Sequence, residues 1–162
     1  DNGISLVYDL NGNDIYSNFF SAPNGINFLF DLKGNDKYNG QIASSYDNGI
    51  AILIDMEGND LYEGKNFTQS YTRNGISILI DARGDDIYNA STYCQASSEG
   101  GVTCLMDFYG NDAFFAKDYA QAYANGFERR AASLLLNFAG DDYYTAKYFC
   151  QGYGEKRRNL PV

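Results

Sequence analysis

Residues Ile50–Tyr62 read IAILIDMEGNDLY: an apolar run that ends in Asp, a turn that contains Gly-Asn-Asp, and a closing tyrosine. This phrase occurs six times in the chain. The other copies are Ile4–Tyr16 (ISLVYDLNGNDIY), Ile26–Tyr38 (INFLFDLKGNDKY), Ile76–Tyr88 (ISILIDARGDDIY), Val102–Phe114 (VTCLMDFYGNDAF) and Ala131–Tyr144 (AASLLLNFAGDDYY). The glycines of the copies stand at positions 12, 34, 58, 84, 110 and 140, so one repeat is 22–30 residues long. Repetition at this period is typical of arrays in which each repeat stacks on the next.

Within each apolar run, alternate positions share a character, as in a β-strand whose two faces differ. We expect the columns five, three and one residues before the first Asp of each copy to form a buried face. They hold Ile4, Ile26, Ile50, Ile76, Val102 and Ala131; Leu6, Phe28, Ile52, Ile78, Cys104 and Leu134; and Tyr8, Phe30, Ile54, Ile80, Met106 and Leu136. The tyrosine after each turn should stack on its counterparts as an aromatic ladder. The sequence therefore predicts an all-β fold, a parallel β-solenoid of about six coils with 22–30 residues per coil. An antiparallel β-meander is the alternative, because Asn-Gly turns also suit hairpins.

A further column, two residues before the Asp, lies on the opposite face of the strand and is aliphatic in every copy. It contains Val7, Leu29, Leu53, Leu79, Leu105 and Leu135. A strand that is apolar on both sides suits a parallel sheet whose two faces are covered. If nothing in the chain covers this column, it is an exposed stripe that invites a partner. The six residues are therefore either core or a candidate interface with other protein chains, in a homo- or hetero-assembly.

The turn D-x-x-G-[N/D]-D places two carboxylates in most copies. The pairs are Asp9 with Asp14, Asp31 with Asp36, Asp55 with Asp60, Asp81 with Asp86, and Asp107 with Asp112; the last copy has Asn137 in place of the first Asp. Stacked in register, like charges would lie about 5 Å apart, and each pair would cost about 1 kcal/mol in water. Calcium held between adjacent turns would offset this cost. Hydrogen bonds from backbone N–H groups of the same turn would do so too, with the turn glycines at positive φ. The ten aspartates are thus candidate calcium ligands or turn caps, and no other cofactor is expected.

The composition limits the function. The chain has 162 residues, a net charge of −9 and a pI of about 4.3, which is unfavourable for binding nucleic acid because that binding relies on cationic side chains that neutralise phosphates. No apolar stretch approaches the roughly 18–20 residues that span a membrane. Histidine is absent, which excludes Ser-His-Asp and Cys-His catalytic arrangements. Acidic pairs recur in the copies as a structural device would, so we expect no enzyme. A polysaccharide-active β-helix that uses one Asp pair with calcium and Arg73 or Arg83 is the alternative.

The later repeats close on Gln followed by a small residue and often an aromatic one, as in Gln69–Tyr71 and Gln151–Tyr153. Four tyrosines near this position either present an aromatic ladder to sugar rings or pack in the core. They are Tyr46, Tyr71, Tyr123 and Tyr153. A glycan-binding module is therefore the second hypothesis for the function.

The motif G-N-D-x-Y (Gly12–Tyr16 and its counterparts), together with Q-G-x-G (Gln151–Gly154), resembles the repeats of bacterial secreted or surface proteins. G-N-D-x-Y by itself resembles part of the nonapeptide repeat of RTX proteins, whose stacked turns hold calcium in a parallel β-roll. The first resemblance spans nearly the whole chain and implies an exported scaffold, extracellular or in the bacterial cell envelope. We therefore expect residues 1–162 to be a single repeat domain, a section of a longer protein, that acts as a non-enzymatic structural or adhesive element through protein–protein contacts.

Overall fold

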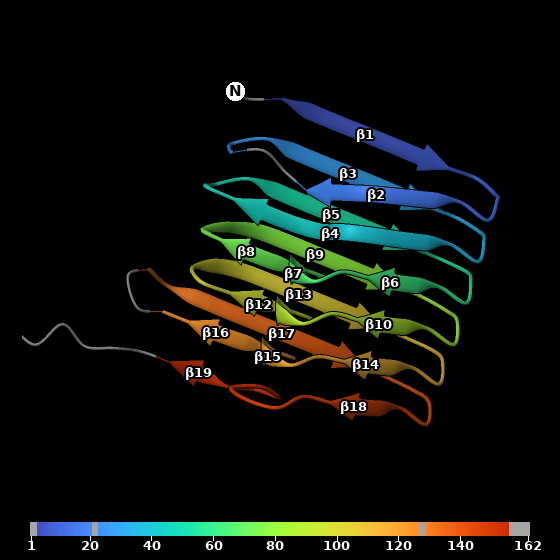
Figure 1. The fold of residues 1–162 in the computed structure, drawn as a ribbon. Coiled ribbons are helices and arrows are strands. Elements are labelled where there is room, and N and C mark those ends of the chain that lie inside the picture. The colour runs from blue at the N-terminus through green and yellow to red at the C-terminus, as the bar shows by residue number, and fades with distance from the viewer. Residues whose placement is uncertain (1–2, 21–22, 127–128, 156–162) are drawn as a thin grey trace, which may run out of the picture.

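The computed structural model describes residues 3–20, 23–126 and 129–155, and over these residues the chain is a β-solenoid (Figure 1). All strand pairs are parallel, so the predicted parallel solenoid is confirmed and the antiparallel meander is wrong. Sheet A takes one strand from each repeat in chain order. Its strands are β1 (Ile4–Asp9), β3 (Ile26–Asp31), β5 (Ile50–Asp55), β9 (Gly75–Asp81), β13 (Gly101–Asp107) and β17 (Ala131–Asn137). In the part of the chain that the structure describes, no helix is long and apolar enough to cross a membrane.

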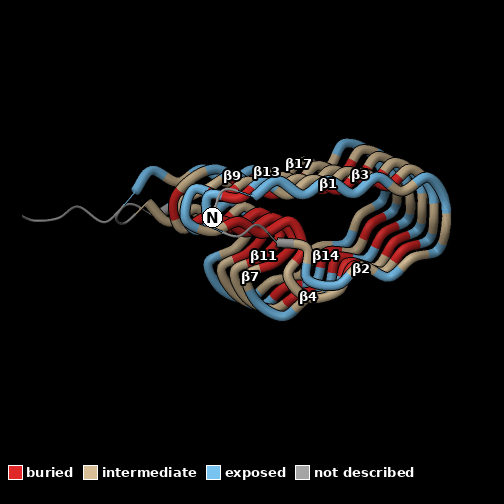
Figure 2. Tube along the Cα trace, turned by 90° about the horizontal axis from the view of Figure 1, so that it is seen from above, coloured by how far each residue is buried: buried red, intermediate tan, exposed pale blue. Residues whose placement is uncertain are grey.

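Two further sheets complete the coils, although sheet C takes strands from only three of them. Sheet B contains β2 (Ile15–Phe20), β4 (Lys37–Tyr46), β6 (Leu61–Glu63), β8 (Tyr71–Arg73), β10 (Ile87–Asn89), β12 (Ser97–Ser98), β14 (Ala113–Phe115), β16 (Tyr123–Asn125), β18 (Tyr143–Thr145) and β19 (Gly154–Glu155). Sheet C contains β7 (Asn66–Thr68), β11 (Thr92–Cys94) and β15 (Asp118–Ala120). Figure 2 looks along the solenoid axis, with sheet A on one long side of a flattened coil and sheets B and C on the other.

Equivalent residues of successive copies lie directly above one another in sheet A. Asp55 pairs with Asp31 on one side and with Asp81 on the other. This register confirms that the phrase is the unit of stacking. The prediction for the last copy is wrong by one position, because Ala132 pairs with Val102, whereas Ala131 pairs with Gly101.

The inward face of sheet A is the opposite of the one expected. The leucine column two residues before the Asp is the core, since Leu29, Leu53, Leu79 and Leu105 are 0–1% exposed. These four residues therefore cannot form an interface, and the intramolecular alternative holds for them. Only the ends of the column, Val7 and Leu135, retain exposed surface.

The narrow interior explains which side of sheet A points inward. The hydroxyl of Ser77 in β9 donates a 2.7 Å hydrogen bond to the carbonyl of Tyr71, across the coil in sheet B. The hydroxyl of Ser70 likewise donates to the carbonyl of Ser77 at 2.9 Å. Backbone this close leaves room only for small side chains, so the column with Ala51, Ser77 and Thr103 faces inward and the large isoleucines face outward.

The predicted aromatic ladder is present and lies in the core. Successive rings stack with centroids 4.4–5.0 Å apart and interplanar angles of 1–12°. The ladder consists of Tyr16, Tyr38, Tyr62, Tyr88, Phe114 and Tyr144. Each offset stacked pair adds about 0.5–1.5 kcal/mol beyond the burial of its area.

A column of glutamines lies at the corner where the chain passes from sheet C to sheet B. It consists of Gln69, Gln95, Gln121 and Gln151. Gln95 and Ala96 both adopt left-handed backbone, with φ of 52° and 63°, which costs free energy for residues other than glycine. The buried Gln95 amide donates to the carbonyl of Tyr88 in its own coil at 2.9 Å and to that of Phe115 in the next coil at 3.0 Å. Gln69 and Gln121 make the equivalent pair of bonds, so each of these three glutamines fixes its corner and joins two coils.

The turn glycines are required by close approach. A Cβ atom on Gly34, Gly58, Gly84 or Gly110 would fall against the carbonyl oxygen of the equivalent glycine in the coil before. The prediction that the turn glycines have positive φ is correct only for Gly140. It is wrong for the other five, which are Gly12, Gly34, Gly58, Gly84 and Gly110.

Candidate functional site

The first aspartate of each turn ends a strand of sheet A and points into the coil. Asp31, Asp55, Asp81 and Asp107 are 0–1% exposed. Each one accepts, through Oδ2, a hydrogen bond from the ladder tyrosine of the preceding coil. The O–O distances are 2.7 Å from Tyr16 to Asp31, 2.6 Å from Tyr38 to Asp55, 2.7 Å from Tyr62 to Asp81 and 2.8 Å from Tyr88 to Asp107. The ladder thus supplies one strong donor to each buried carboxylate.

The second aspartate of each turn links one coil to the coil before it. Oδ1 of Asp60 accepts the backbone N–H of Asp36 at 2.6 Å, and Oδ1 of Asp86 accepts that of Asp60 at 2.6 Å. The same bond recurs from the first coil to the last, at distances of 2.6–3.0 Å. The residue before the second aspartate, Asn in most copies, accepts a hydrogen bond from the following coil instead. Oδ1 of Asn35, for example, accepts the N–H of Asn59 at 2.9 Å. Together these side chains fasten the turns on both sides.

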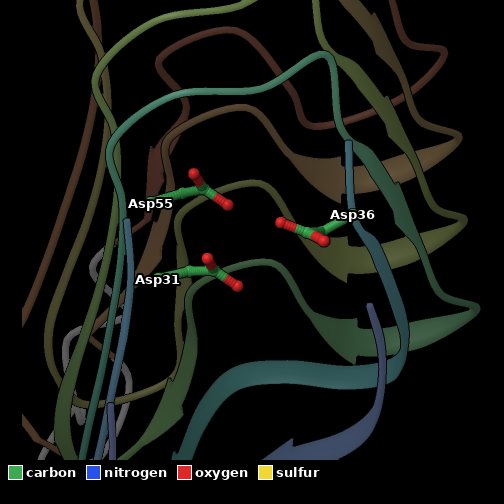
Figure 3. Close-up of side chains that lie close together, drawn as sticks. All are labelled: Asp31, Asp36 and Asp55. Atoms are coloured by element: carbon green, nitrogen blue, oxygen red, sulfur yellow. The ribbon is translucent and has the colours of Figure 1, made fainter. Parts of the chain in front are cut away.

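These bonds leave one oxygen of several buried carboxylates unused. The atoms without a hydrogen-bond partner are Oδ2 of Asp36, Asp60 and Asp86 and Oδ1 of Asp55 and Asp107. The two aspartate columns face each other across the inside of the turn, as Figure 3 shows for Asp31, Asp36 and Asp55. In three groups, one oxygen from each member lies within 4.8 Å of the others. The groups are Asp31, Asp36 and Asp55; Asp60, Asp81 and Asp86; and Asp86, Asp107 and Asp112. We refer to these residues as the acidic row.

Burial shifts the protonation of the acidic row. It raises the pKa of Asp36 to about 6, and burial with the charge of Asp55 raises that of Asp60 to about 9. Burial likewise raises the pKa of Asp86 to about 8 and, with the Asp112 charge, that of Asp107 to about 7.

Arginine and lysine do not compensate this charge in the part of the chain that the structure describes. The ion pairs of the described residues are all exposed. They join Lys33 and Arg83 to Glu57, Lys37 to Glu63, and Arg73 to Asp47. Arg73 and Arg83, which the sequence offered as partners of an Asp pair, are paired with Asp47 and Glu57 and not with the acidic row.

The structure brings most of the predicted metal-ligand residues together, and it also shows turn caps. Oδ1 of Asp81 accepts the N–H of Arg83 two residues on, as in an Asx turn, and Asp9 does the same with Asn11. Asp9 and Asp14 lie outside the three groups. Capping and ion binding are compatible where the cap occupies one oxygen and leaves the other without a partner, as in Asp60 and Asp86, whereas in Asp81 the second oxygen accepts the Tyr62 hydroxyl.

A second candidate site is the outward face of sheet A, which we call the outer face. Four columns point outward, at five, three and one residues before the Asp and one residue after it. The fourth column, not anticipated from the sequence, holds Leu10, Leu32, Met56, Ala82, Phe108 and Phe138. The outer face carries no charged residue at any of these positions. Its exposure is substantial: 39% for Ile76, 49% for Val102 and 48% for Leu134.

The tyrosines proposed for glycan binding do not form an open platform. Tyr71 and Tyr123 are 1% exposed, which contradicts a role for them in stacking on sugars; Tyr46 and Tyr153 are half-buried. A polar groove of about 500 Å³ does run beside the join of sheets B and C, with Asn39, Glu63 and Asn66 among its lining residues. None of the four tyrosines lines it.

The structure contains a second aromatic ladder, which was not predicted from the sequence. It consists of Phe67, Tyr93, Tyr119 and Phe149, whose successive rings stack 4.7–5.3 Å apart. The signal was present, since an aromatic residue stands two positions before Gln69, Gln95, Gln121 and Gln151. Its rings cover one another's faces, so they offer mainly edges to a ligand.

Comparison of the chain with family models, with curated proteins and with solved structures finds no match. The function must therefore be inferred from the acidic row and the outer face themselves.

Proposed function

We propose that the chain is a non-enzymatic structural module that docks on another protein chain through the outer face of sheet A. The observation that carries this proposal is the absence of charge from four adjacent outward columns in a protein with a net charge of −9. The expected extracellular or envelope location is part of the same proposal. In this view the interface is the isoleucine side of the strands, opposite to the leucine column.

The size of the outer face suits a stable contact. Six strands about 4.8 Å apart, with about eight residues at 3.3 Å each, make a flat surface of roughly 600–750 Å². The largest apolar patch on a typical monomer is about 300–600 Å², whereas a standard interface buries about 800 Å² per partner. Two sheets can stack at about 10 Å with side chains interdigitated, which the flat parallel columns favour.

The test introduces charge on this face. Ile76→Lys/Val102→Lys places two lysines in the outer face, where docking would bury them without partners at a cost of several kcal/mol. We expect light scattering after gel filtration to show an assembly for the unaltered chain and a monomer for this variant.

The matched control is Ile15→Lys/Ile87→Lys, at residues that are 71% and 44% exposed on sheet B. It makes the same chemical change on the other side of the coil and should leave the assembly intact. Circular dichroism confirms that both variants fold. An unaltered chain that is monomeric and binds no protein from bacterial envelope extracts, or equal loss of assembly in the two variants, would refute the proposal.

A further inference from the structure

We propose that the acidic row binds calcium ions inside the solenoid, between neighbouring coils. The carboxylates are already oriented: each has one oxygen fixed by a tyrosine hydroxyl or a backbone N–H group. In five of the eight, Asp36, Asp55, Asp60, Asp86 and Asp107, the other oxygen has no hydrogen-bond partner although the side chain is only 0–3% exposed. An unpaired buried carboxylate oxygen is costly, so these atoms indicate a missing partner.

The distances fit one ion per group. Calcium binds oxygen at about 2.3–2.6 Å, so two oxygens on the same ion are at most about 5 Å apart. The three oxygens of each group lie within 4.8 Å of one another. Each group also combines residues of two consecutive coils, as Asp55 joins Asp31 and Asp36 of the coil before. An ion there would therefore link coil to coil.

The charge and the donor type select the ion. Each of the four middle copies adds two buried carboxylates, and one divalent ion per copy would neutralise them without any basic side chain. The donors are oxygens alone, whereas zinc prefers nitrogen and sulfur ligands. Magnesium requires near-ideal octahedral geometry and keeps several waters, while calcium accepts irregular carboxylate sites.

Asp86 offers the most informative variant, because it belongs to two of the three groups. Asp86→Asn removes a charge from both groups and keeps an oxygen that can accept the N–H of Asp60. The matched control is Asp85→Asn at the exposed adjacent residue, where most copies of the repeat already have Asn. The two variants have the same net charge and differ only in which side of the turn they alter.

The experiment starts from the 162-residue chain, treated with chelator and dialysed into calcium-free buffer. Calcium titration by calorimetry and metal analysis should show at least two ions per chain, and calcium should raise Tm by several degrees, reversibly with chelator. Terbium gives a local readout: the chain has no tryptophan, and the ladder tyrosines donate to the acidic row, so their excitation should sensitise bound terbium. Asp85→Asn should behave like the unaltered chain, and Asp86→Asn should lose at least one ion and most of the Tm shift.

Failure of the unaltered chain to bind calcium or gain Tm would overturn the proposal, as would equal loss in Asp85→Asn and Asp86→Asn. If Asp86→Asn does not fold, Asp107→Asn replaces it, since the last coil already has Asn137 at that position. The oligomeric state plays no part in these readouts, so they are independent of the docking role of the outer face.

Discussion

Oδ2 of Asp107 accepts a 2.8 Å hydrogen bond from the hydroxyl of Tyr88 in the preceding coil, and the next step of the ladder lacks both partners. There the tyrosine is replaced by Phe114 and the aspartate that it would serve by Asn137. A phenylalanine offers no donor to a buried carboxylate, and at this step the neutral amide of Asn137 stands in place of the carboxylate. The tyrosine of one coil and the first aspartate of the next are thus one functional pair in the fold.

This pairing predicts a coupled response to substitution. Tyr62→Phe leaves Oδ2 of the buried Asp81 without its donor, which should lower the free energy of unfolding by about 1–3 kcal/mol. Adding Asp81→Asn reproduces the natural combination of the last coil and should restore part of the loss. Equilibrium urea unfolding of the two single variants and the double variant, in calcium-free buffer, measures a coupling energy of about 0.5–3 kcal/mol. Strict additivity would show that the two side chains act independently.

The stacking of coils could be predicted from the sequence, but the direction of the side chains could not. Each copy carries the same turn, so equal columns had to stack whichever face was buried. The Leu53 and Ile52 columns are equally apolar, and the deciding residue is Asp55, which shares the leucine side by the two-residue period. A carboxylate is expected to face water. Its inward position depends on the Tyr38 hydroxyl of another coil, and that contact exists only once the path of the coil is known.

The sequence predicted which aspartates belong to the acidic row, but not which of them lie next to one another. The spacing of Asp55 and Asp60 indicated a turn, in which hydrogen bonds within the turn would cap both carboxylates. The structure instead places Asp60 opposite Asp81 of the next coil, with its cap supplied by the backbone of Asp36 in the coil before. Intercoil contacts of this kind are not encoded in the spacing within one repeat.

The raised pKa values predict an unusual pH dependence for the calcium-free chain. The pKa is about 9 for Asp60 and about 8 for Asp86, against about 3.9 in the unfolded chain. A folded pKa above the unfolded one means that the native state holds protons that the unfolded state releases. The contribution of these two groups to the stability of the fold is therefore complete below about pH 4. It is lost as the pH rises through their pKa values in the folded chain, up to about pH 9.

Thermal melts of the chelated chain between pH 4 and pH 9 should thus show a falling Tm. Asp60→Asn/Asp86→Asn removes two of the titrating groups and should flatten the curve. A Tm that rises over this interval would mean that the carboxylates are stabilised in their charged form without calcium.

The glutamine corner predicts a strong dependence on position within one column. Gln95→Ala removes two buried hydrogen bonds to backbone carbonyls of successive coils and leaves a cavity beside left-handed backbone. The free energy of unfolding should fall by about 2–4 kcal/mol. Gln151→Ala is the control at the exposed end of the same column and should change it by no more than about 0.5 kcal/mol. Urea unfolding compares the two, and equal effects would contradict the role of the amide as a link between coils.

The contact between turn glycines predicts that a single methyl group disrupts the stack. In Gly84→Ala the new Cβ would fall against the carbonyl oxygen of Gly58, which is backbone and cannot turn aside as a flexible side chain would. The turns must then move apart and lose the bond from the N–H of Asp60 to Oδ1 of Asp86. We expect a loss of more than about 3 kcal/mol, in the range of the most severe single substitutions. Gly154→Ala is the control, because no atom lies within 4 Å of its Cβ position and its φ is not positive. Hydrogen exchange locates the damage: amides of the acidic turns on either side of residue 84 should lose protection, and protection kept there with global destabilisation would place the cause elsewhere.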